Sequence, residues 1–268
     1  MKNKSKLYII AAGLSSRMGG YPKHLCTIDG QGMTNIENTL FLAYMHYDEI
    51  VVVLNKNLAE EYAVETTNIA EKYRAKVKFI ESGKGDGHAI YEAIKDEKDY
   101  DEVTCVWGDT YFSNIDIFQS KIHADLLTVV CAKDISPYCY INVYNDWFFS
   151  CLYKNTYKTV ESMYFKSDYP IKENRKYLHD QSTFVVNVNK FKKYFSQYID
   201  YCDYTTKTLV KVKDLEYSII KFANWVIQIR KEEHLINAFI LKERKNRPYT
   251  LSFNTKEELQ KVVNLNKL

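Results

Sequence analysis

The sequence predicts an α/β protein with a single doubly wound, mostly parallel β-sheet and helices on both of its faces. Apolar runs typical of buried parallel strands alternate with helical stretches in the N-terminal half, and these runs cover 7–12, 50–54, 77–80 and 103–107. Such alternation implies right-handed crossovers, with ligands at the carboxyl ends of the strands. With 268 residues, the chain can bury such a core without disulfides.

Further elements follow from local signals. Thr34 and Asn35 are residue types that cap helices, and they precede a helical stretch over 36–47. More helical stretches are expected over 60–73 and 90–95, and more strands over 126–131, 148–154 and 179–188.

The C-terminal segment contains a capping-box pattern. Thr255 followed by Glu258 predicts the start of a helix. Because no repeat or low-complexity linker marks a boundary, we expect one domain over 1–242 and a C-terminal strand and helix extension over 243–268.

Composition argues against several classes of function. The net charge is +3 and the lysines are spread along the chain, so nothing resembles a nucleic-acid-binding stripe or a polybasic membrane patch. No apolar run is long enough for a transmembrane helix. The six cysteines form no CxxC pair or His/Cys cluster, which argues against structural zinc. We expect a soluble, cytoplasmic protein and leave the formation of a homo-oligomer open.

The stretch Leu7–Leu25, LYIIAAGLSSRMGGYPKHL, predicts a polyphosphate-binding loop. Its apolar strand breaks at Gly13 into a loop whose glycines allow close approach to a ligand and whose N–H groups can form an anion-binding concavity. Arg17 and Lys23 add two positive charges. The spacing fits neither the P-loop nor the dinucleotide-binding fingerprint. The alternative is a Gly/Ser loop without function.

This stretch resembles the signature loop of nucleotidyltransferases with a glycosyltransferase-A-like, Rossmann-like fold. The group includes sugar-phosphate pyrophosphorylases, cytidylyltransferases and molybdopterin guanylyltransferases, whose pattern reads roughly [L/A]AGxSxRMGxxPKxL. The matching positions are Ala11, Ala12, Gly13, Ser15, Ser16, Arg17, Met18, Gly19, Pro22, Lys23 and Leu25. The nucleotide-binding residues that this resemblance implies are Ala11, Ala12, Gly13, Ser15 and Ser16. It also implies that Arg17 grips the β- and γ-phosphates and that Lys23 contacts the α-phosphate.

A second glycine-rich stretch, GKGDGHA over 83–89, precedes a predicted helix. It could simply be a strand-to-helix connection in which His88 packs against or caps the helix. Pyrophosphorylases carry a similar G-x-G-[HA]-A segment, and this resemblance implies that Gly85, Gly87 and His88 contact the nucleotide. Unpaired N–H groups at a helix N-terminus would suit such a contact.

Gly108-Asp109 ends the strand predicted over 103–107. A carboxylate at this end of a strand suits Mg²⁺, which takes one or two carboxylates plus substrate phosphates, although it can also cap a turn. In the family resembled here, the Asp of this pair binds the metal, which implies that Asp109 is a Mg²⁺ ligand. The segment 225–239 resembles the entry to the family's last conserved helix. There, Gln228 occupies the place where relatives have a second Asp or Asn at the metal, or a Lys. Gln is a poor Mg²⁺ ligand, so the second metal ligand stays open. Glu232 and Glu233 are alternatives, although an acidic pair is more typical of the first turn of a helix.

The acceptor side matches the family less closely. The segment 136–141 is similar to the P-x-x-Y-G-x-[IV] segment that begins a β-hairpin in sugar-phosphate pyrophosphorylases, although the glycine of that pattern is absent. A small antiparallel hairpin region is therefore expected on the acceptor side. Lys154 corresponds to a lysine that meets the acceptor's phosphate, although a lone lysine is more often a solvated residue. Asp180 lies near the acidic position of the strand that cradles the acceptor, where Ser182 or Thr183 replaces the usual glycine.

Together these features predict transfer of a nucleoside monophosphate group from an NTP to the phosphate or phosphonate of a small metabolite, with release of pyrophosphate. Molybdopterin guanylyltransferases have Ala-Gly-Gly at this point of the loop, so by this resemblance Ala-Ala-Gly at 11–13 implies a pyrimidine nucleotide, CTP before UTP. The acceptor is open among phosphocholine, a polyol phosphate, a phosphorylated amino acid and a phosphonate, and we expect a precursor of a surface polysaccharide or lipid-linked glycan. One alternative is a glycosyltransferase of the same fold using an NDP-sugar, since 99–101 has the DxD spelling. The other alternative is a non-catalytic relative. Such a protein would be expected to lack Arg17, Lys23 or Asp109, and all three are present in this sequence.

Overall fold

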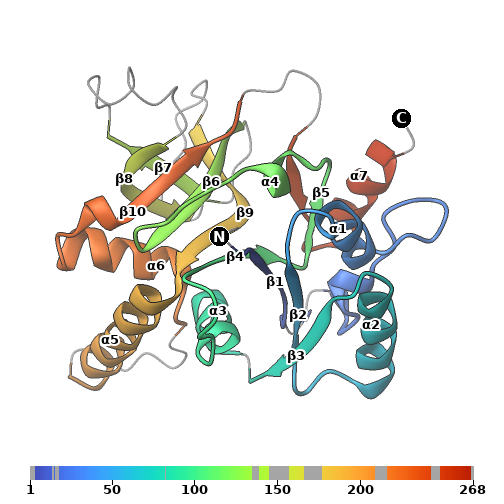
Figure 1. The fold of residues 1–268 in the computed structure, drawn as a ribbon, viewed down its shortest axis with the longest axis horizontal. Coiled ribbons are helices and arrows are strands. Elements are labelled where there is room, and N and C mark those ends of the chain that lie inside the picture. The colour runs from blue at the N-terminus through green and yellow to red at the C-terminus, as the bar shows by residue number, and fades with distance from the viewer. Residues whose placement is uncertain are drawn as a thin grey trace. The chain divides into compact units, whose positions relative to one another are not determined.

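The structure is a computed structural model. It describes residues 4–13, 15, 18–81, 83–134, 139–144, 157–165, 177–208, 216–242 and 248–266. The chain divides into two compact units. The first comprises Met1–Gly83, Val103–Lys121 and Arg247–Leu268, and the second comprises Lys84–Glu102 and Ile122–Asn246. Figure 1 labels the elements of both units. Because the chain passes between the units more than once, residues distant in sequence meet within each of them.

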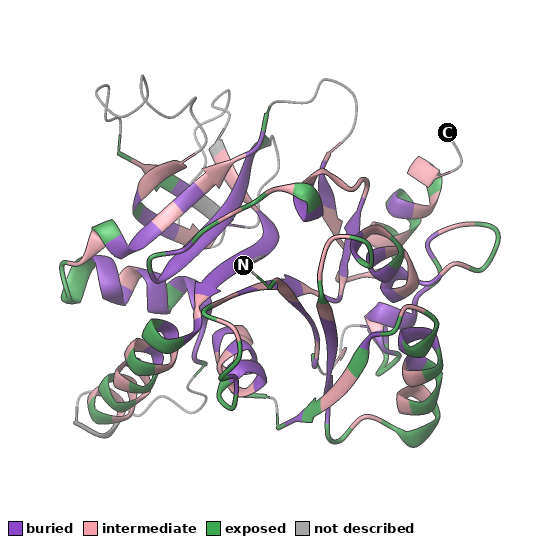
Figure 2. Cartoon of the chain, viewed as in Figure 1, coloured by how far each residue is buried: buried purple, intermediate pink, exposed green. Residues whose placement is uncertain are grey.

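The first unit contains parallel strands in the order β3-β2-β1-β4. Their bounds are β1 Lys6–Ala11, β2 Glu49–Asn55, β3 Lys76–Ile80 and β4 Glu102–Trp107. Ala11 lies opposite Leu54, and Ile10 lies opposite Trp107, so the carboxyl ends of β1, β2 and β4 are in register. The interior of β1 and β2 is buried, as the purple strands in Figure 2 show.

Two helices follow strands of this sheet where the sequence predicts them. They are α1, Asn35–Ala43, and α2, Glu60–Lys72. Thr34 is the N-cap of α1, because its side-chain oxygen accepts a hydrogen bond from the Glu37 N–H at 3.2 Å. Along α2, the buried residues are Thr66, Ile69 and Ala70, and the opposite side is exposed (Figure 2).

The described part of the C-terminal segment packs within the first unit. Its strand β11, Thr250–Ser252, pairs antiparallel with β5, Thr110–Phe112, and is followed by α7, Lys256–Asn266. The capping pattern is confirmed, because Thr255 Oγ1 accepts a hydrogen bond from the Glu258 N–H at 3.3 Å. The unit also contains two short helices, η2 Lys23–Leu25 and α4 Asp116–Gln119.

In its described residues, the second unit is built on five strands with the order β9-β6-β10-β8-β7. Their bounds are β6 Leu127–Asp134, β7 Cys139–Val143, β8 Tyr157–Phe165, β9 Tyr177–Asn187 and β10 Ile236–Ile240. Only β6 and β10 pair in parallel among them, and the other pairs are antiparallel. Since β7 also pairs with β9, the five strands form a closed ring of pairings.

The helices of the second unit bury aromatic side chains. They are α3 Asp86–Ile94, α5 Val188–Thr208, α6 Ile219–Asn224, the π-helical turn η4 Trp225–Ile229 and the short η5 Glu233–Leu235. Phe191, Phe195 and Phe222 are fully buried. The Phe195 and Phe222 ring centroids are 5.1 Å apart, so α5 and α6 share a core.

Two sequence-based expectations about the fold are corrected. The sheet is not mostly parallel throughout, because the parallel pattern of the first unit gives way to mostly antiparallel pairing in the second. The segment 225–239 does not enter a last helix. It forms η4, η5 and then β10, because residues 236–240 hydrogen-bond to β6 on one side and residues 237–239 pair with β8 on the other. The strand expected over 148–154 lies outside the described residues.

Candidate active site

Ser15 organises the loop that follows β1. Its backbone is in the left-handed region, with φ of 49°. Its carbonyl oxygen accepts hydrogen bonds from the N–H groups of Met18, at 2.9 Å, and Gly20, at 3.2 Å. Its hydroxyl oxygen accepts a hydrogen bond from the Lys23 N–H at 3.3 Å. Ser15 therefore turns the loop back on itself and fixes the backbone at Lys23.

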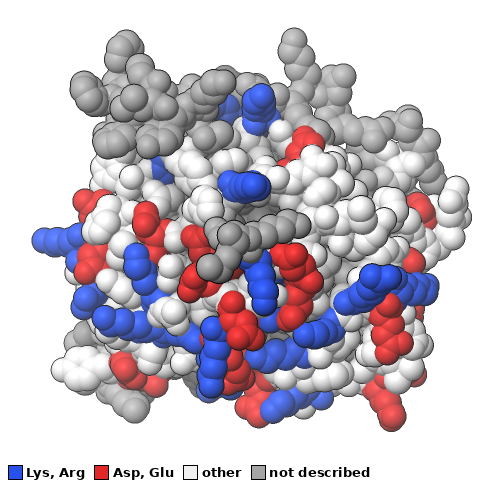
Figure 3. Space-filling view, viewed as in Figure 1, with Lys and Arg blue, Asp and Glu red and all other residues white. Residues whose placement is uncertain are grey.

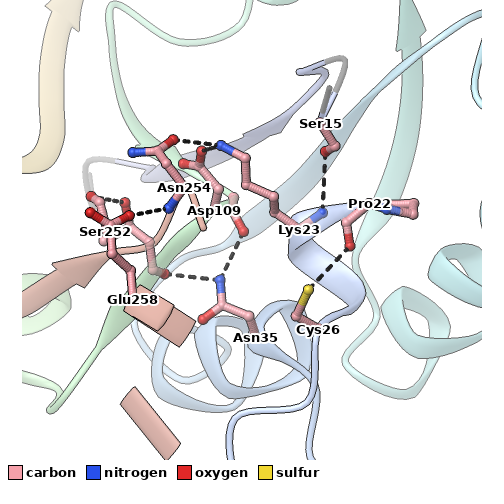
Figure 4. Close-up of polar contacts among 11 residues, drawn as sticks. Ser15, Pro22, Lys23, Cys26, Asn35, Asp109, Ser252, Asn254 and Glu258 are labelled. Carbon is pink, nitrogen blue, oxygen red and sulfur yellow. Dashed lines mark hydrogen bonds and ion pairs between the residues drawn. The ribbon is translucent and has the colours of Figure 1, made fainter. Parts of the chain in front are cut away.

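The ammonium group of Lys23 contacts two oxygen atoms from distant parts of the chain. Its Nζ donates to Asp109 Oδ2 at 2.6 Å and to Asn254 Oδ1 at 2.9 Å (Figure 4). The Lys23 side chain is 15% exposed and the Asp109 side chain 37%, so solvent screens this ion pair only in part. The structure thus brings together two of the three residues predicted to carry the chemistry.

The turn that carries Asp109 is fixed by close packing and by a buried amide. A Cβ at Gly108 would lie 2.7 Å from the Ala11 Cβ, so a larger residue would push the ends of β4 and β1 apart. Asn35 is fully buried, and its Nδ2 donates to the carbonyl oxygens of Gly108, at 2.8 Å, and Thr110, at 3.1 Å. These contacts hold Asp109 at the end of β4.

Sequence reasoning missed the roles of Asn35 and Asn254. Asn35 is expected from the sequence as a helix cap, but its side chain instead binds carbonyl groups 73 and 75 residues away. Asn254 directly precedes the capping residue of α7, in a segment predicted to be an extension. No motif marks either residue, because a hydrogen bond between residues this far apart depends on the folded chain.

His24, next to Lys23, is a buried neutral side chain. It is 3% exposed, and its Nε2 lies 2.9 Å from Thr66 Oγ1. The Thr66 hydroxyl donates to the Tyr62 carbonyl, so it accepts a hydrogen bond from His24 Nε2–H. Burial lowers the pKa of His24 to about 4. This contact anchors η2 to α2 and so supports the position of Lys23.

Several predicted nucleotide-binding residues have little contact or lie outside the description. Ser16 and Arg17 lie outside the described residues, so their roles stay predictions. Ala11 ends β1, and Ala12 is buried. A Cβ at Gly13 would meet nothing within 4 Å, so the space beside this backbone is open. Such space is consistent with close approach of a ligand.

Gly85 and Gly87 have a packing role in the second unit. A Cβ at Gly85 would lie 2.8 Å from the backbone nitrogen of Tyr217, and one at Gly87 would lie 2.8 Å from that of Ile219. Both positions therefore exclude a larger residue, because the backbone at 217–219 approaches the start of α3. Their contact with a nucleotide stays a prediction.

Two N–H groups at the start of α3, those of Gly87 and His88, are occupied, contrary to the expectation from the sequence. The Gly87 N–H donates to Asp86 Oδ1 at 2.7 Å, and the His88 N–H donates to the Tyr217 carbonyl at 3.1 Å. Asp86 Oδ1 also accepts a hydrogen bond from the Ile219 N–H at 2.8 Å, while burial raises the pKa of Asp86 to about 6. The His88 ring stacks on Tyr217, with centroids 5.8 Å apart, so His88 does pack within this unit.

The structure describes one of the two predicted acceptor residues. Lys154 lies outside the described residues. Asp180 lies in β9 opposite Cys131 of β6, and its Oδ1 accepts a hydrogen bond from the Ser182 N–H at 2.9 Å. Ser182 has φ of 55°, so Ser182, rather than Thr183, has the conformation that favours glycine. Acceptor binding by Asp180 stays a prediction.

The chemistry of Asp109 fits a Mg²⁺ ion that arrives with a nucleotide. In the described ranges, no three His, Cys, Asp or Glu side chains group in a way that could hold a metal ion by themselves. Mg²⁺ requires only one or two carboxylates when phosphates and water complete its coordination. A partly exposed carboxylate beside a lysine therefore suits it. Gln228, which occupies the position of the family's second metal ligand, is an exposed residue of η4.

Three further features concern the glycosyltransferase alternative, the surface charge and the possibility of a membrane-spanning helix. Asp99-Tyr100-Asp101 precedes β4, so this DxD spelling does not end a strand. Acidic and basic side chains are interspersed on the face shown in Figure 3. In the part of the chain that the structure describes, no helix combines the length and apolar character needed to cross a membrane.

Solved structures with a similar fold cover nearly the whole chain. A nucleoside-diphosphate-sugar pyrophosphorylase from Vibrio cholerae RC9 is 17% identical with a TM-score of 0.65, over 96% of this chain and 99% of that one. HddC from Yersinia pseudotuberculosis is 17% identical with a TM-score of 0.61, over 98% and 99%. The inositol-1-phosphate CTP transferase from T. maritima is 12% identical with a TM-score of 0.61, over 97% and 96%. At such identities the likeness establishes the fold alone.

Comparison with sequence families identifies the first half of the chain. No curated protein matches the sequence. The family described as the MobA-like NTP transferase domain matches residues 7–146. This stretch includes Lys23, Asp109 and the loop after β1 that contains Ser15, called the Ser15 loop below. Because this match spans just over half of the sequence, the chain belongs to the MobA-like NTP transferase domain family, whose members are nucleotidyltransferases.

Proposed function

We propose that the protein transfers a nucleoside monophosphate group from an NTP to the phosphate or phosphonate of a small metabolite and releases pyrophosphate. The observation that carries this proposal is the contact between Lys23 and Asp109, at 2.6 Å, within the stretch that matches the family. It supplies a cation and a carboxylate side by side, which is the pair that a nucleotide and its metal ion require.

The reaction is an in-line displacement at the α-phosphorus. An oxygen of the acceptor forms a bond to the α-phosphorus while the bond to the oxygen that bridges the α- and β-phosphates breaks, and pyrophosphate leaves with that oxygen. A phosphate monoester has a second pKa of about 6, so the nucleophile is largely ionised near neutral pH and needs no general base. The barrier lies in bringing two polyanions together and aligning them.

The charged residues of the chain reduce this barrier. Lys23 contacts the α-phosphate, where charge develops, and Arg17 grips the β- and γ-phosphates of the leaving group. Asp109 would hold Mg²⁺, which supplies neutralisation of phosphate charge when it is bound. In the structure Lys23 donates to Asp109, so nucleotide binding exchanges this ion pair for contacts with phosphate and metal.

The proposal also specifies the nucleotide and the class of acceptor. Ala-Ala-Gly at 11–13 favours a pyrimidine nucleotide, CTP before UTP. The inositol-1-phosphate CTP transferase with a similar fold is consistent with a polyol phosphate acceptor. The altered acceptor motifs favour a substrate other than a standard hexose 1-phosphate. The product would serve as a precursor of a surface polysaccharide or a lipid-linked glycan.

The test is a pyrophosphate-release screen of CTP, UTP, GTP and ATP against a panel of phosphorylated acceptors with Mg²⁺. The panel contains phosphocholine, a polyol phosphate, a phosphorylated amino acid, a phosphonate and hexose 1-phosphates. We expect release with CTP or UTP and one acceptor class. Silence across the panel, together with sugar release from an NDP-sugar, would favour the glycosyltransferase instead.

A further inference from the structure

We infer that Asn254, in the C-terminal segment, is a positioning residue that holds the Lys23 ammonium group for the α-phosphate. The inference rests on the proposed function and deepens it, because it makes the C-terminal segment part of the site. Asn254 is 231 residues from Lys23 in sequence and belongs to the same compact unit.

The first reason is the geometry around Lys23. A lysine side chain is long and flexible, and ordering it costs conformational entropy. Its Nζ contacts Asp109 Oδ2 at 2.6 Å and Asn254 Oδ1 at 2.9 Å, and these oxygens come from two different segments (Figure 4). Asp109 is also the proposed metal ligand, so its contact with Lys23 is exchanged when the nucleotide binds. Asn254 has no such competing task and keeps the ammonium in place through this exchange.

The second reason is charge. The amide oxygen of Asn254 accepts a hydrogen bond without neutralising the lysine, so the positive charge of Lys23 stays available to phosphate. A carboxylate at this position would be a second anion beside Asp109 and would compete with the phosphate for Lys23.

The third reason is that Asn254 is itself held firmly. Its backbone N–H donates to Glu258 Oε2 at 2.6 Å, which ties it to the first turn of α7. The preceding Phe253 is fully buried and packs in a cluster with Met18 of the Ser15 loop. The other end of α7 is also tied, because Asn266 Nδ2 donates to the Ile28 carbonyl at 2.7 Å.

A double-mutant cycle in the pyrophosphate-release assay tests the inference. We expect Asn254→Ala to lower kcat by about tenfold, the effect of removing one hydrogen bond to a charged group. In a Lys23→Ala background the same change should have no further effect, because Asn254 acts through Lys23. Equal losses in both backgrounds would overturn the inference, as would wild-type kcat in Asn254→Ala.

Two companion variants sharpen this cycle. The matched control is Asn264→Ala, which removes the same type of side chain from an exposed position of α7 and should leave kcat unchanged. Asn254→Asp keeps an oxygen acceptor but adds charge, so we expect a higher KM for the NTP than in the wild type. A KM as low as that of the wild type would contradict the charge argument.

A measurement without nucleotide separates this inference from the proposed function. Acetylation of Lys23 by acetic anhydride, followed by mass spectrometry of its peptide, reports how firmly the amine is held. We expect Lys23 to react faster in Asn254→Ala than in the wild type or in Asn264→Ala, and equal rates would overturn the inference. If the wild type releases no pyrophosphate with any substrate pair, the proposed function fails, while the acetylation rate still decides whether Asn254 holds Lys23.

Discussion

The predicted catalytic residues of the first unit and the predicted acceptor residue of the second unit are associated with different kinds of strand pairing. In the first unit, Lys23 and Asp109 follow β1 and β4, which run parallel. In the second unit, Asp180 lies within β9, which runs antiparallel to β6 and β7. Parallel strands bring their carboxyl ends to one edge, so residues 86 positions apart can meet there. Antiparallel strands send alternate ends to opposite edges and collect fewer such residues at either one.

The predicted phosphate-binding residues are easier to identify from the sequence than the predicted acceptor-binding residues. Phosphates of any NTP present the same charges, so a few generic residues at one sheet edge are sufficient for their recognition. Acceptors differ in shape and charge, so their recognition depends on loops that vary among proteins. The predictions below compare variants of the two units, from the largest expected effect to the smallest.

The largest effect is expected for Asp109→Ala. Removal of this carboxylate takes away the proposed Mg²⁺ ligand, so we expect no Mg²⁺-dependent pyrophosphate release above background. The matched change in the second unit, Asp180→Ala, should raise the KM for the acceptor and leave the KM for the NTP unchanged. Full activity of Asp109→Ala in a Mg²⁺ titration would remove this residue from the site and erase the contrast between the units.

Lys23→Ala should lower kcat by about 10²–10³, the usual effect of losing one donor to a developing charge. Lys190 lies on the surface of α5 in the second unit, and Lys190→Ala should leave kcat unchanged. Steady-state kinetics at saturating NTP and acceptor measure both variants. Unchanged turnover of Lys23→Ala would be incompatible with contact between this lysine and the α-phosphate.

The sequence alone was sufficient to predict the position of residues that belong to a local motif or directly follow a predicted strand. Gly108-Asp109 follows an apolar strand, and Lys23 belongs to a nearly contiguous motif, so both could be assigned to a strand end before the fold was known. Asn35 and Asn254 could not be assigned, because their partners lie 73 to 231 residues away and an asparagine is common in any turn. Their roles depend on which segments the fold brings together.

Strand direction in the second unit was the other property that the sequence could not supply. The apolar run over 126–131 has the composition of a buried strand whichever way its neighbours run. In the structure β6 is parallel to β10 and antiparallel to β9, and only the fold establishes this difference. The packing role of Gly85 and Gly87 could not be predicted from the sequence either, because the backbone that they contact, at 217–219, is remote in sequence.

The pH dependence of stability should have opposite signs in the two units. Burial lowers the pKa of His24 to about 4 from 6.5, so the unfolded chain binds more protons between these values and stability is lost as pH falls from 6.5 to 4. Burial raises the pKa of Asp86 to about 6 from 3.8, so its contribution is full below pH 3.8 and is lost as pH rises to 6. Each effect is on the order of 3 kcal/mol, at 1.36 kcal/mol per pKa unit.

Urea unfolding between pH 4 and pH 7 measures these two contributions. His24→Gln should lose less stability than the wild type as pH falls from 6.5 to 4, because Gln does not titrate. Asp86→Asn should lose less stability than the wild type as pH rises from 4 to 6, because Asn does not titrate either. Both variants keep a hydrogen-bonding group of similar length without the titration. Curves parallel to that of the wild type would show that the two buried groups do not titrate in this range.

The smallest effect compares two glycines that the sequence assigns to the same task. Gly87→Ala should destabilise the protein by about 1–3 kcal/mol, the usual cost of overpacking, because its Cβ would lie 2.8 Å from the Ile219 nitrogen. Gly13→Ala should leave the Tm unchanged, because its Cβ would meet nothing within 4 Å, but should weaken NTP binding by filling the space beside the loop. Thermal unfolding and calorimetric titration with CTP separate the two outcomes. A Gly87→Ala protein of wild-type stability that no longer bound CTP would move nucleotide recognition into the second unit and overturn the contrast between the two.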